Sequence, residues 1–292
     1  MSKSDELTVA VTGASRGIGR GAARVLGARG ATVYVTGRTQ GMGGAARPDE
    51  MPLPGTIEEA AAEVTAAGGR GVAVACDLAD DGQIKALFEQ IERERGGLDI
   101  LVNNAAFLHN AANTPGPFWK RPVEMANIID VGLRCHFVAT YYAAPLLVSR
   151  GKGLVVNISF YGDAGLHDPA YHAAKAGMDK LAQTFAIDFK PFGIAAVSLW
   201  PGLVATERLQ HFADRSPALK ERLSTFESQD FCGRVIDALY RDPELMSLTG
   251  KTLIAAEMAQ RYGVSDVDGK QPKSYRGEFG KPHEAFDIGD LK

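Results

Sequence analysis

Residues Thr12–Gly19 read TGASRGIG and stand between a short apolar run and a longer amphipathic one. The apolar run Leu7–Thr12 predicts a β-strand, and Ile18–Arg29, rich in Ala, Arg and Leu, predicts a helix. Gly13 allows a tight turn because glycine lacks a Cβ atom. A strand, a glycine turn and a helix in this order predict the first unit of a parallel α/β sheet.

The same alternation continues along most of the chain. Short β-branched or apolar runs predict further strands at Thr32–Thr36, Val72–Cys76, Ile100–Asn103, Leu154–Ser159 and Ile194–Trp200. Longer segments predict helices at Ile57–Ala67, Asp80–Arg95, Val123–Arg150 and Tyr171–Phe189. The strands are apolar almost throughout, as expected when both faces are covered. The pattern therefore predicts one doubly wound Rossmann-type parallel sheet with helices on both faces.

Two stretches interrupt this rhythm. Gly37–Gly55 is rich in Gly and Pro and predicts a long loop, and Glu257–Lys292 is polar and predicts an extended tail. Neither an internal repeat nor a linker divides the chain. We therefore expect one domain over residues 1–256 and a C-terminal extension over residues 257–292.

The composition narrows the classes of protein. The 292 residues are 45% hydrophobic and 23% charged, with a net charge of −3, so no basic surface favours nucleic acid. Cys76, Cys135 and Cys232 lie far apart and form no C-x-x-C motif, which favours a reducing compartment, the cytoplasm, over a disulfide framework. The polar start of the chain is no signal peptide, and we expect no membrane span.

The glycine turn has the form of a dinucleotide-binding loop. A helix N-terminus presents free N–H groups to an anion, and the glycines let a pyrophosphate approach the backbone. The alternative is a turn with a structural role alone. The second strand is followed by Arg38 rather than by an acid that would bind ribose hydroxyls. Arg38 and Arg16 suit a 2′-phosphate, which predicts NADP(H), unless both are solvated surface arginines.

Tyr171 and Lys175 are four residues apart on a predicted helix, so their side chains share one face. A free phenol titrates near a pH of about 10. A neighbouring ammonium lowers the pKa of a phenol, which would bring it closer to the working range of a general acid. Ser159 ends a strand twelve residues earlier, where its hydroxyl is expected to bond the substrate oxygen.

Five motifs in order resemble the short-chain dehydrogenase/reductase superfamily over residues 8 to 206. They are TGASRGIG, Asp77-Leu78, Asn103-Asn104-Ala105-Ala106, Ser159 with Tyr171-x-x-x-Lys175, and Pro201-Gly202. The segments VGLRCHF (131–137), VSLWPG (197–202) and 247–269, with less weight LPGT (53–56), resemble the branch named dehydrogenase/reductase SDR family member 1.

The resemblance implies hydride transfer between NADP(H) and a small carbonyl or alcohol substrate, in a homodimer or homotetramer. It implies Tyr171 as general acid/base, Lys175 as its partner and Ser159 as the residue that orients the substrate. The cofactor residues that the motifs imply are Gly13, Ser15, Arg16, Gly17, Ile18, Gly19, Arg38, Asp77, Leu78, Asn104, Ala105, Tyr171, Lys175, Pro201, Gly202, Val204 and Thr206.

Two positions depart from the family pattern. Ala106 replaces the usual last glycine of Asn-Asn-Ala-Gly, and Gly132 stands where the family places a catalytic asparagine that holds a proton-relay water. Asn127 is five residues earlier, about 140° around a helix, and cannot simply substitute. We expect Gly132 to keep a helix break and to leave space for water. This departure concerns the proton relay more than hydride transfer itself. The alternative to an active reductase is a catalytically impaired nucleotide-binding sensor or scaffold.

The histidines predict no metal site, because His109, His136, His167 and His172 lack metal-ligand spacing. We expect structural roles for them, with His167 a candidate for the substrate cleft. Aromatic residues cluster in segments that lead to the carboxyl edge of the sheet, where such folds bind ligands. They favour an apolar substrate over ordinary packing, and they are Phe107, Phe118, Trp119, Phe160 and Tyr161.

Overall fold

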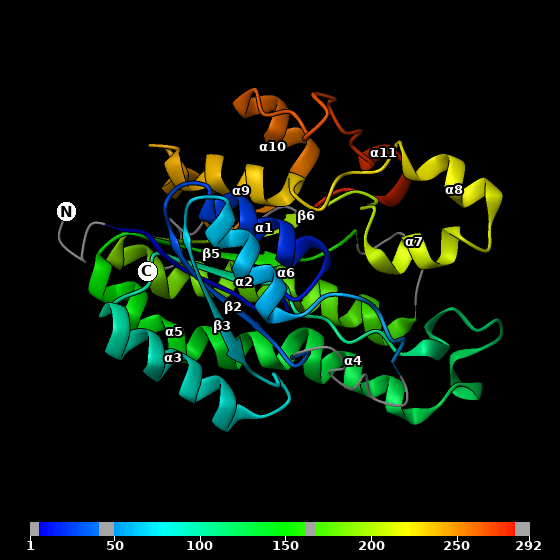
Figure 1. Cartoon of the computed structure of the whole chain (residues 1–292), viewed down its shortest axis with the longest axis horizontal. Coiled ribbons are helices and arrows are strands. Elements are labelled where there is room, and N and C mark those ends of the chain that lie inside the picture. The colour runs from blue at the N-terminus through cyan, green and yellow to red at the C-terminus, as the bar shows by residue number, and fades with distance from the viewer. Residues whose placement is uncertain (1–5, 41–49, 162–167, 284–292) are drawn as a thin grey trace.

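Seven parallel strands run side by side in the order β3-β2-β1-β4-β5-β6-β7 in the computed structural model, which describes residues 6–40, 50–161 and 168–283 (Figure 1). The strands are β1 (Thr8–Val11), β2 (Thr32–Gly37), β3 (Arg70–Ala75), β4 (Ile100–Asn103), β5 (Gly153–Ile158), β6 (Ile194–Trp200) and β7 (Thr252–Ile254). The predicted doubly wound parallel sheet is confirmed.

Helices cover both faces of the sheet. The α-helices are α1 (Gly17–Gly27), α2 (Ile57–Ala66), α3 (Asp81–Arg95), α4 (Asn127–Ile129), α5 (Cys135–Arg150), α6 (Pro169–Phe189), α7 (Glu207–Ala213), α8 (Pro217–Leu223), α9 (Phe231–Arg241), α10 (Ala255–Tyr262) and α11 (Arg276–Phe279). One core cluster joins α1, α2 and α9 to the sheet, and a second joins α3, α5 and α6 to its other face. Figure 1 shows α1, α2 and α9 on the opposite side from α3 and α5.

Strand residues alternate between the two cores. Val9 and Val11 of β1 belong to the first core cluster, and Ala10 between them belongs to the second. Successive side chains of a strand point to opposite faces, so a strand buried on both sides is apolar at every position. This is why the sequence pattern identified the strands without any polar alternation.

The order in which successive strands are added to the sheet reverses at β1. β1 pairs with β2 on one side and with β4 on the other, so the connections leave the two strands toward opposite edges. In open parallel sheets such a switch point leaves a crevice outside the carboxyl ends of the strands. The residues that follow β1 and β4 therefore meet at one place.

The predicted helix Val123–Arg150 is interrupted. It consists of a 3₁₀ turn (Val123–Ala126), α4, a π-helical segment (Asp130–Arg134) and α5. Val131 leaves helical geometry with φ −101° and ψ 16°. A π-helical turn inside a helix is rare and occurs mostly at functional sites, and here it contains Gly132.

This helical stretch is the one among the described residues that is long and apolar enough to cross a membrane, whereas we expected none. Half of its most apolar window is buried inside the protein. Cys135, Ala139 and Ala143 belong to the core beside α3 and α6, so the apolar composition is that of a core helix.

The C-terminal part of the chain contains structure that the sequence reasoning did not anticipate. β7 has only three residues, and α7, α8 and α9 follow β6. α9 carries an apolar stripe, with Phe231, Val235 and Leu239 buried in the core. Their spacing of four residues could have predicted this helix from the sequence. The expected domain boundary after residue 256 falls inside α10, whose Met258 and Ala259 also belong to the core.

Candidate active site

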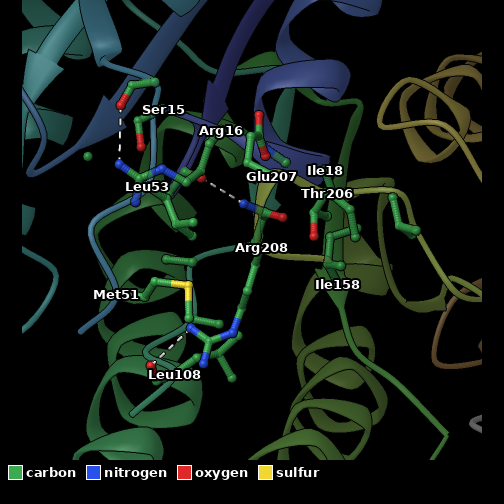
Figure 2. Close-up of a pocket in the computed structure, with 18 of the residues that line it drawn as sticks. Ser15, Arg16, Ile18, Met51, Leu53, Leu108, Ile158, Thr206, Glu207 and Arg208 are labelled. Carbon is green, nitrogen blue, oxygen red and sulfur yellow. Dashed lines mark hydrogen bonds between the residues drawn. The ribbon is translucent and has the colours of Figure 1, made fainter. Parts of the chain in front are cut away.

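A cleft of about 990 Å³ opens at the carboxyl ends of the strands (Figure 2). Its lining includes residues that directly follow β1, β3, β4, β5 and β6. It brings together all but one of the predicted site residues: Gly13, Ser15, Arg16, Gly17, Ile18, Arg38, Asp77, Leu78, Asn104, Ala105, Ser159, Tyr171, Lys175, Pro201, Gly202, Val204 and Thr206. Gly19, the remaining residue, lies behind the loop.

The glycines of the first loop are required by close backbone contacts. Gly13 has φ 63°, and a Cβ atom built on it would lie 2.7 Å from the Cα of Ala105. A Cβ on Gly19 would lie 2.4 Å from the side-chain nitrogen of Asn104 and 2.7 Å from the carbonyl oxygen of Gly13. Any side chain at either position would push the loop away from β4.

Hydrogen bonds from Asn104 stabilise this loop. Its side-chain nitrogen donates to the carbonyl oxygens of Thr12 (2.9 Å) and Gly13 (3.0 Å), and its backbone N–H donates to the Thr12 hydroxyl (2.9 Å). Asn104 also lines the cleft, as expected of a cofactor residue. Its amide holds the glycine turn against the end of β4.

An acidic side chain lies at the N-terminus of α1. The backbone N–H of Gly17 donates to a carboxylate oxygen of Glu207 at 3.0 Å, and Glu207 is the first residue of α7. The free N–H groups and the helix dipole make this position favourable for an anion. Sequence reasoning assigned the position to a phosphate and gave no signal that Glu207 reaches it.

The two arginines proposed for a 2′-phosphate are held by the segment that follows residue 49. One guanidinium nitrogen of Arg38 lies 2.5 and 2.6 Å from the two carboxylate oxygens of Glu50. Arg16 donates to the carbonyl oxygens of Pro54 (3.1 Å) and Gly55 (3.2 Å) and to the hydroxyl of Thr39 (3.1 Å). Both arginines line the cleft. Arg16 is half-buried, whereas Arg38 is exposed and has its guanidinium paired with Glu50.

Ser159, Tyr171 and Lys175 meet where β5 ends against α6. The ammonium of Lys175 donates to the carbonyl oxygen of Ile158 (2.8 Å), and the hydroxyl of Ser159 donates to the carbonyl oxygen of Lys175 (2.9 Å). The ammonium nitrogen lies 5.6 Å from the centre of the Tyr171 ring. Strand end and helix face are thus tied together by the catalytic side chains themselves.

Burial dominates the ionisation of this pair. It lowers the pKa of the Lys175 ammonium to about 8 and raises the pKa of the Tyr171 phenol above its ordinary value. We expected the ammonium to lower the pKa of the phenol. In this arrangement the ammonium is directed at the Ile158 carbonyl, and the cost of ionising a phenol away from water prevails.

Asp179 extends the same helix face by one more turn and was not identified from the sequence. Its carboxylate accepts hydrogen bonds from the Ser198 hydroxyl (2.5 Å) and the Trp200 indole N–H (3.0 Å), and it also bonds Ser159. The carboxylate raises the pKa of Lys175 against the effect of burial. The spacing of Tyr171, Lys175 and Asp179, four residues each, was a signal that could have revealed it.

Gly132 lies against α6 beside the catalytic lysine. A Cβ atom built on Gly132 would meet only the Cβ of Ala174, at an ordinary contact distance of 3.5 Å. Asn127 does not line the cleft. The expected helix break at Gly132 is present as the π-helical segment. Apart from Ala174, no described residue contacts the Cβ position of Gly132.

The Pro201-Gly202 turn rests on two residues from later in the chain. The N–H of Gly202 donates to one carboxylate oxygen of Glu227 (2.9 Å), and the side chain of Glu227 is only 2% exposed. Its second carboxylate oxygen is buried without a partner among the described residues. Burial raises the pKa of Glu227 to about 8. The ring of Tyr275 approaches Gly202 so closely that a Cβ there would lie 2.9 Å from it.

An aromatic wall connects the C-terminal extension to the catalytic tyrosine. The rings of Tyr275 and Phe279 stack at 4.8 Å, and Phe279 contacts Phe160, whose ring lies 6.4 Å from that of Tyr171. The backbone N–H of Tyr275 donates to the hydroxyl of Tyr161. The extension predicted as a polar tail therefore contributes apolar side chains to the surroundings of the site.

Of the five aromatic residues expected at the cleft, Phe160 alone lines it. Tyr161 is buried beside the aromatic wall and Phe107 in the core that contains α3 and α5, while Phe118 and Trp119 are 59% and 69% exposed on a 3₁₀ turn. The apolar lining comes mainly from residues that the sequence did not single out, namely Met51, Leu53, Leu108, Leu209 and Phe212.

The histidines have structural contacts. A ring nitrogen of His136 lies 2.8 Å from the carbonyl oxygen of Ala105, and burial lowers the pKa of His136 to about 3, so the ring is neutral. His109 accepts from the N–H of Ala111. His167 lies outside the described residues. Within the described part of the chain, no group of His, Cys, Asp or Glu residues has the arrangement of a metal site.

The cleft fits a nicotinamide dinucleotide. Its lining runs from Arg38 to Lys175, and the glycine loop allows the close backbone approach that a pyrophosphate needs, at the helix terminus where the Gly17 N–H now donates to Glu207. The guanidinium groups of Arg16 and Arg38 would suit a phosphate-bearing ligand, and Ser159, Tyr171 and Lys175 line the same cleft.

Comparisons with known proteins agree with this site. The family model described as short chain dehydrogenase matches residues 7–216. The chain is 40% and 41% identical over 278 residues to dehydrogenase/reductase SDR family member 1 of Mus musculus and Homo sapiens, covering 91% of this chain and 84% of each relative. A solved short chain dehydrogenase from Mycobacterium thermoresistibile has a TM-score of 0.76 at 25% identity, covering 96% of this chain and 94% of that one.

The strand order, the glycine loop, the residues at the end of β5 and the extent of the sequence match all lead to one conclusion. The chain belongs to the short-chain dehydrogenase/reductase superfamily of nicotinamide-dependent oxidoreductases, where it resembles the branch of dehydrogenase/reductase SDR family member 1.

Proposed function

We propose that this chain is an NADP(H)-dependent reductase of carbonyl compounds, or the corresponding alcohol dehydrogenase, with Tyr171 as its general acid/base. The observation that carries the proposal is the meeting of Ser159, Tyr171 and Lys175 in the same cleft as the glycine loop. A cleft built for nucleotide binding alone has no physical need for this trio.

The chain's own residues supply a proton and an oriented substrate. The bound nicotinamide supplies or accepts the hydride. Because burial keeps the Tyr171 phenol protonated at neutral pH, Tyr171 is suited to donate its proton to a carbonyl oxygen. The Ser159 hydroxyl, which rotates freely between partners, bonds the same oxygen and fixes its direction. The Lys175 ammonium stabilises the phenolate that remains.

Several residues would hold the cofactor. The N–H groups at the start of α1, from Gly17 onward, would face its pyrophosphate, and Arg16 and Arg38 would face a 2′-phosphate. Asp77 and Leu78 line the cleft where β3 ends beside β2, and Val204 and Thr206 line it after Pro201-Gly202, with Thr206 next to Gly17. Lys175 would bond the ribose next to the nicotinamide.

The test is the replacement Tyr171→Phe, which keeps the ring and removes the proton. A positioned acid contributes about 10²–10⁴-fold to a reaction rate, so kcat with NADPH and a good ketone substrate should fall by that factor. The dissociation constant of NADPH, measured by fluorescence titration, should stay unchanged. Tyr141→Phe, an exposed tyrosine on α5, is the matched control and should keep full turnover. Near-normal turnover in Tyr171→Phe would refute the mechanism.

The competing proposal is a nucleotide-binding sensor or scaffold, and Gly132 favours it because the usual relay asparagine is missing. The two proposals differ in one measurement. A sensor binds NADPH in the titration yet oxidises none of it with a panel of ketones and quinones, whereas a reductase consumes the cofactor with at least one of them.

We further infer a homo-oligomer in the cytoplasm. α5 exposes Phe137 and Tyr141, which are 50% and 65% accessible, and an exposed apolar helix face of this kind favours burial against a second copy. The three cysteines are buried and free, which suits a reducing compartment. Light scattering of the purified protein measures the oligomeric state directly.

A further inference from the structure

Arg208 is the third arginine that lines the cleft, beside Arg16 and Arg38, and the family motifs do not account for it. It is the second residue of α7. Figure 2 shows its side chain extending across the cleft between Met51 and Leu108. One guanidinium nitrogen donates to the carbonyl oxygen of Leu108 at 3.3 Å.

The charge of Arg208 is not neutralised within the protein. Arg38 is paired with Glu50, and Arg16 donates to two carbonyl oxygens and a hydroxyl. No carboxylate among the described residues forms an ion pair with Arg208, and the attraction of Glu50 acts only from a distance. Burial lowers the pKa of Arg208. A partly desolvated cation with one long hydrogen bond leaves most of its donors available to an anion.

The surroundings of the guanidinium are apolar. Leu108, Leu209 and Phe212 line the cleft around it, with the guanidinium carbon 5.8 Å from the centre of the Phe212 ring, and Met51 lies on the other side. A charge-assisted hydrogen bond is stronger where water is excluded, so an anion here would be bound tightly. The neighbouring side chains would contact an apolar body attached to that anion.

We propose that Arg208 binds an anionic oxygen group, a carboxylate or a phosphoryl group, at one end of an otherwise apolar substrate. The proposal rests on the proposed function, since it concerns the substrate of the same cleft. The substrate is favoured over the cofactor because the cofactor phosphates have other partners, the N–H groups of α1 and the arginines Arg16 and Arg38. Arg208 instead bridges α7 to the segment after β4.

The experiment compares an apolar aromatic keto acid with its methyl ester, in which a methyl group replaces the negative charge of the carboxylate. Binding of each to the complex with oxidised NADP⁺ is measured by calorimetry, where no reduction takes place. The variants are Arg208→Met, which keeps the apolar stem, and Arg208→Lys, which keeps the charge. Arg215→Met removes a charge from the exposed residue just beyond α7 and is the matched control.

We expect replacement of Arg208 to change the affinity for the keto acid and not the affinity for the ester. Arg208→Met should weaken binding of the keto acid about 10- to 100-fold, as expected for hydrogen bonds to a charged group, and leave the ester unchanged. Arg208→Lys should retain part of the preference for the acid, and Arg215→Met all of it. A titration of each variant with NADPH alone identifies the source of the anion. A loss of NADPH affinity in Arg208→Met would assign Arg208 to a cofactor phosphate and overturn the substrate assignment.

An unchanged ratio of acid to ester affinity in Arg208→Met would also overturn the inference. The proposed function is judged separately by turnover in the unmodified protein. If neither ketone is reduced while the acid still binds through Arg208, the oxidoreductase proposal fails and the anion site remains.

Discussion

The carboxylate of Glu207 accepts a hydrogen bond from the backbone N–H of Gly17, at 3.0 Å, across 190 residues of sequence. This contact joins the first residue of α7 to the first residue of α1. It places a negative charge at the helix terminus where the pyrophosphate of a dinucleotide is expected. A phosphate that accepted a hydrogen bond from the same N–H would have to displace the Glu207 carboxylate.

Replacing Glu207 with Gln should tighten cofactor binding. The amide keeps the size of the side chain and removes the charge that competes for the N-terminus of α1. Charges at a helix terminus contribute about 0.3–1 kcal/mol, so the dissociation constant of NADPH should fall about two- to fivefold. Fluorescence titration measures it, with Glu221→Gln on the exposed face of α8 as control. Weaker binding in Glu207→Gln would show that the acid assists the cofactor.

The choice between NADPH and NADH should depend on the pair Arg38 and Glu50. Their ion pair, at 2.5 Å, competes with a 2′-phosphate for the guanidinium. Glu50→Gln should therefore increase the preference for NADPH over NADH, and Arg38→Asp should reverse it by repulsion. A hydrogen bond between charged groups is worth about tenfold or more in affinity. Titrations of both cofactors provide the measurement, and equal affinities in the unmodified protein would contradict NADP(H) preference.

Asp179 should act as a positioning residue for Lys175. The titratable groups near the ammonium are the Asp179 carboxylate, the buried thiol of Cys135, the neutral ring of His136 and the protonated phenol of Tyr171. Only the Asp179 carboxylate carries a charge that supports the ammonium. Activity should fall as the pH rises through about 8, where Lys175 loses its proton. Asp179→Asn keeps the acceptor for Ser198 and Trp200 and should move this fall to lower pH.

The measurement for Asp179 is kcat/KM as a function of pH, together with the melting temperature. Asp188→Asn, an exposed acid on the same helix, is the control and should keep the original profile. A lower melting temperature with an unmoved pH profile would assign Asp179 a purely structural role.

Glu227 should make the stability of the fold depend on pH. Burial raises its pKa from 4.5 to about 8, so the native state retains a proton that the unfolded chain has already released. The contribution is complete below a pH of about 4.5 and is lost as the pH rises through about 8. Glu227→Gln mimics the protonated acid. Its melting temperature should decline less than that of the unmodified protein between these limits, and an identical decline would contradict the burial effect.

The sequence predicted the parts of the molecule that have a regular period or a short-range steric requirement. The strands from β1 to β6 are fully buried or alternate in a simple way, and Thr56 caps the N-terminus of α2 by accepting a hydrogen bond from the N–H of Glu59. The glycine turn is fixed by contacts of the backbone itself. The strands and the cap depend on neighbours in the sequence, so one chain suffices to identify them. The glycine turn is identified by its motif, although its contacts reach Asn104 and Ala105.

The contacts of the site were less predictable because they join distant segments. Glu50 reaches Arg38 and Glu207 reaches Gly17 only after the loops have folded over the cleft. Charged side chains in such segments look like ordinary solvated residues in the sequence. The pKa of Tyr171 was expected to fall, whereas burial raises it, since the spacing to Lys175 says nothing about where the ammonium points.

During synthesis, the active site is complete only after the residues of the aromatic wall have been translated. The motif residues all precede residue 207, whereas Tyr275 and Phe279, which stack against each other and reach Phe160 and Gly202, are among the last described residues to leave the ribosome. A nascent chain already has every family motif while the surroundings of its catalytic tyrosine are still unfinished. A shortened transcript that ends after the motifs would therefore encode a recognisable member of the superfamily whose active site lacks the aromatic residues Tyr275 and Phe279.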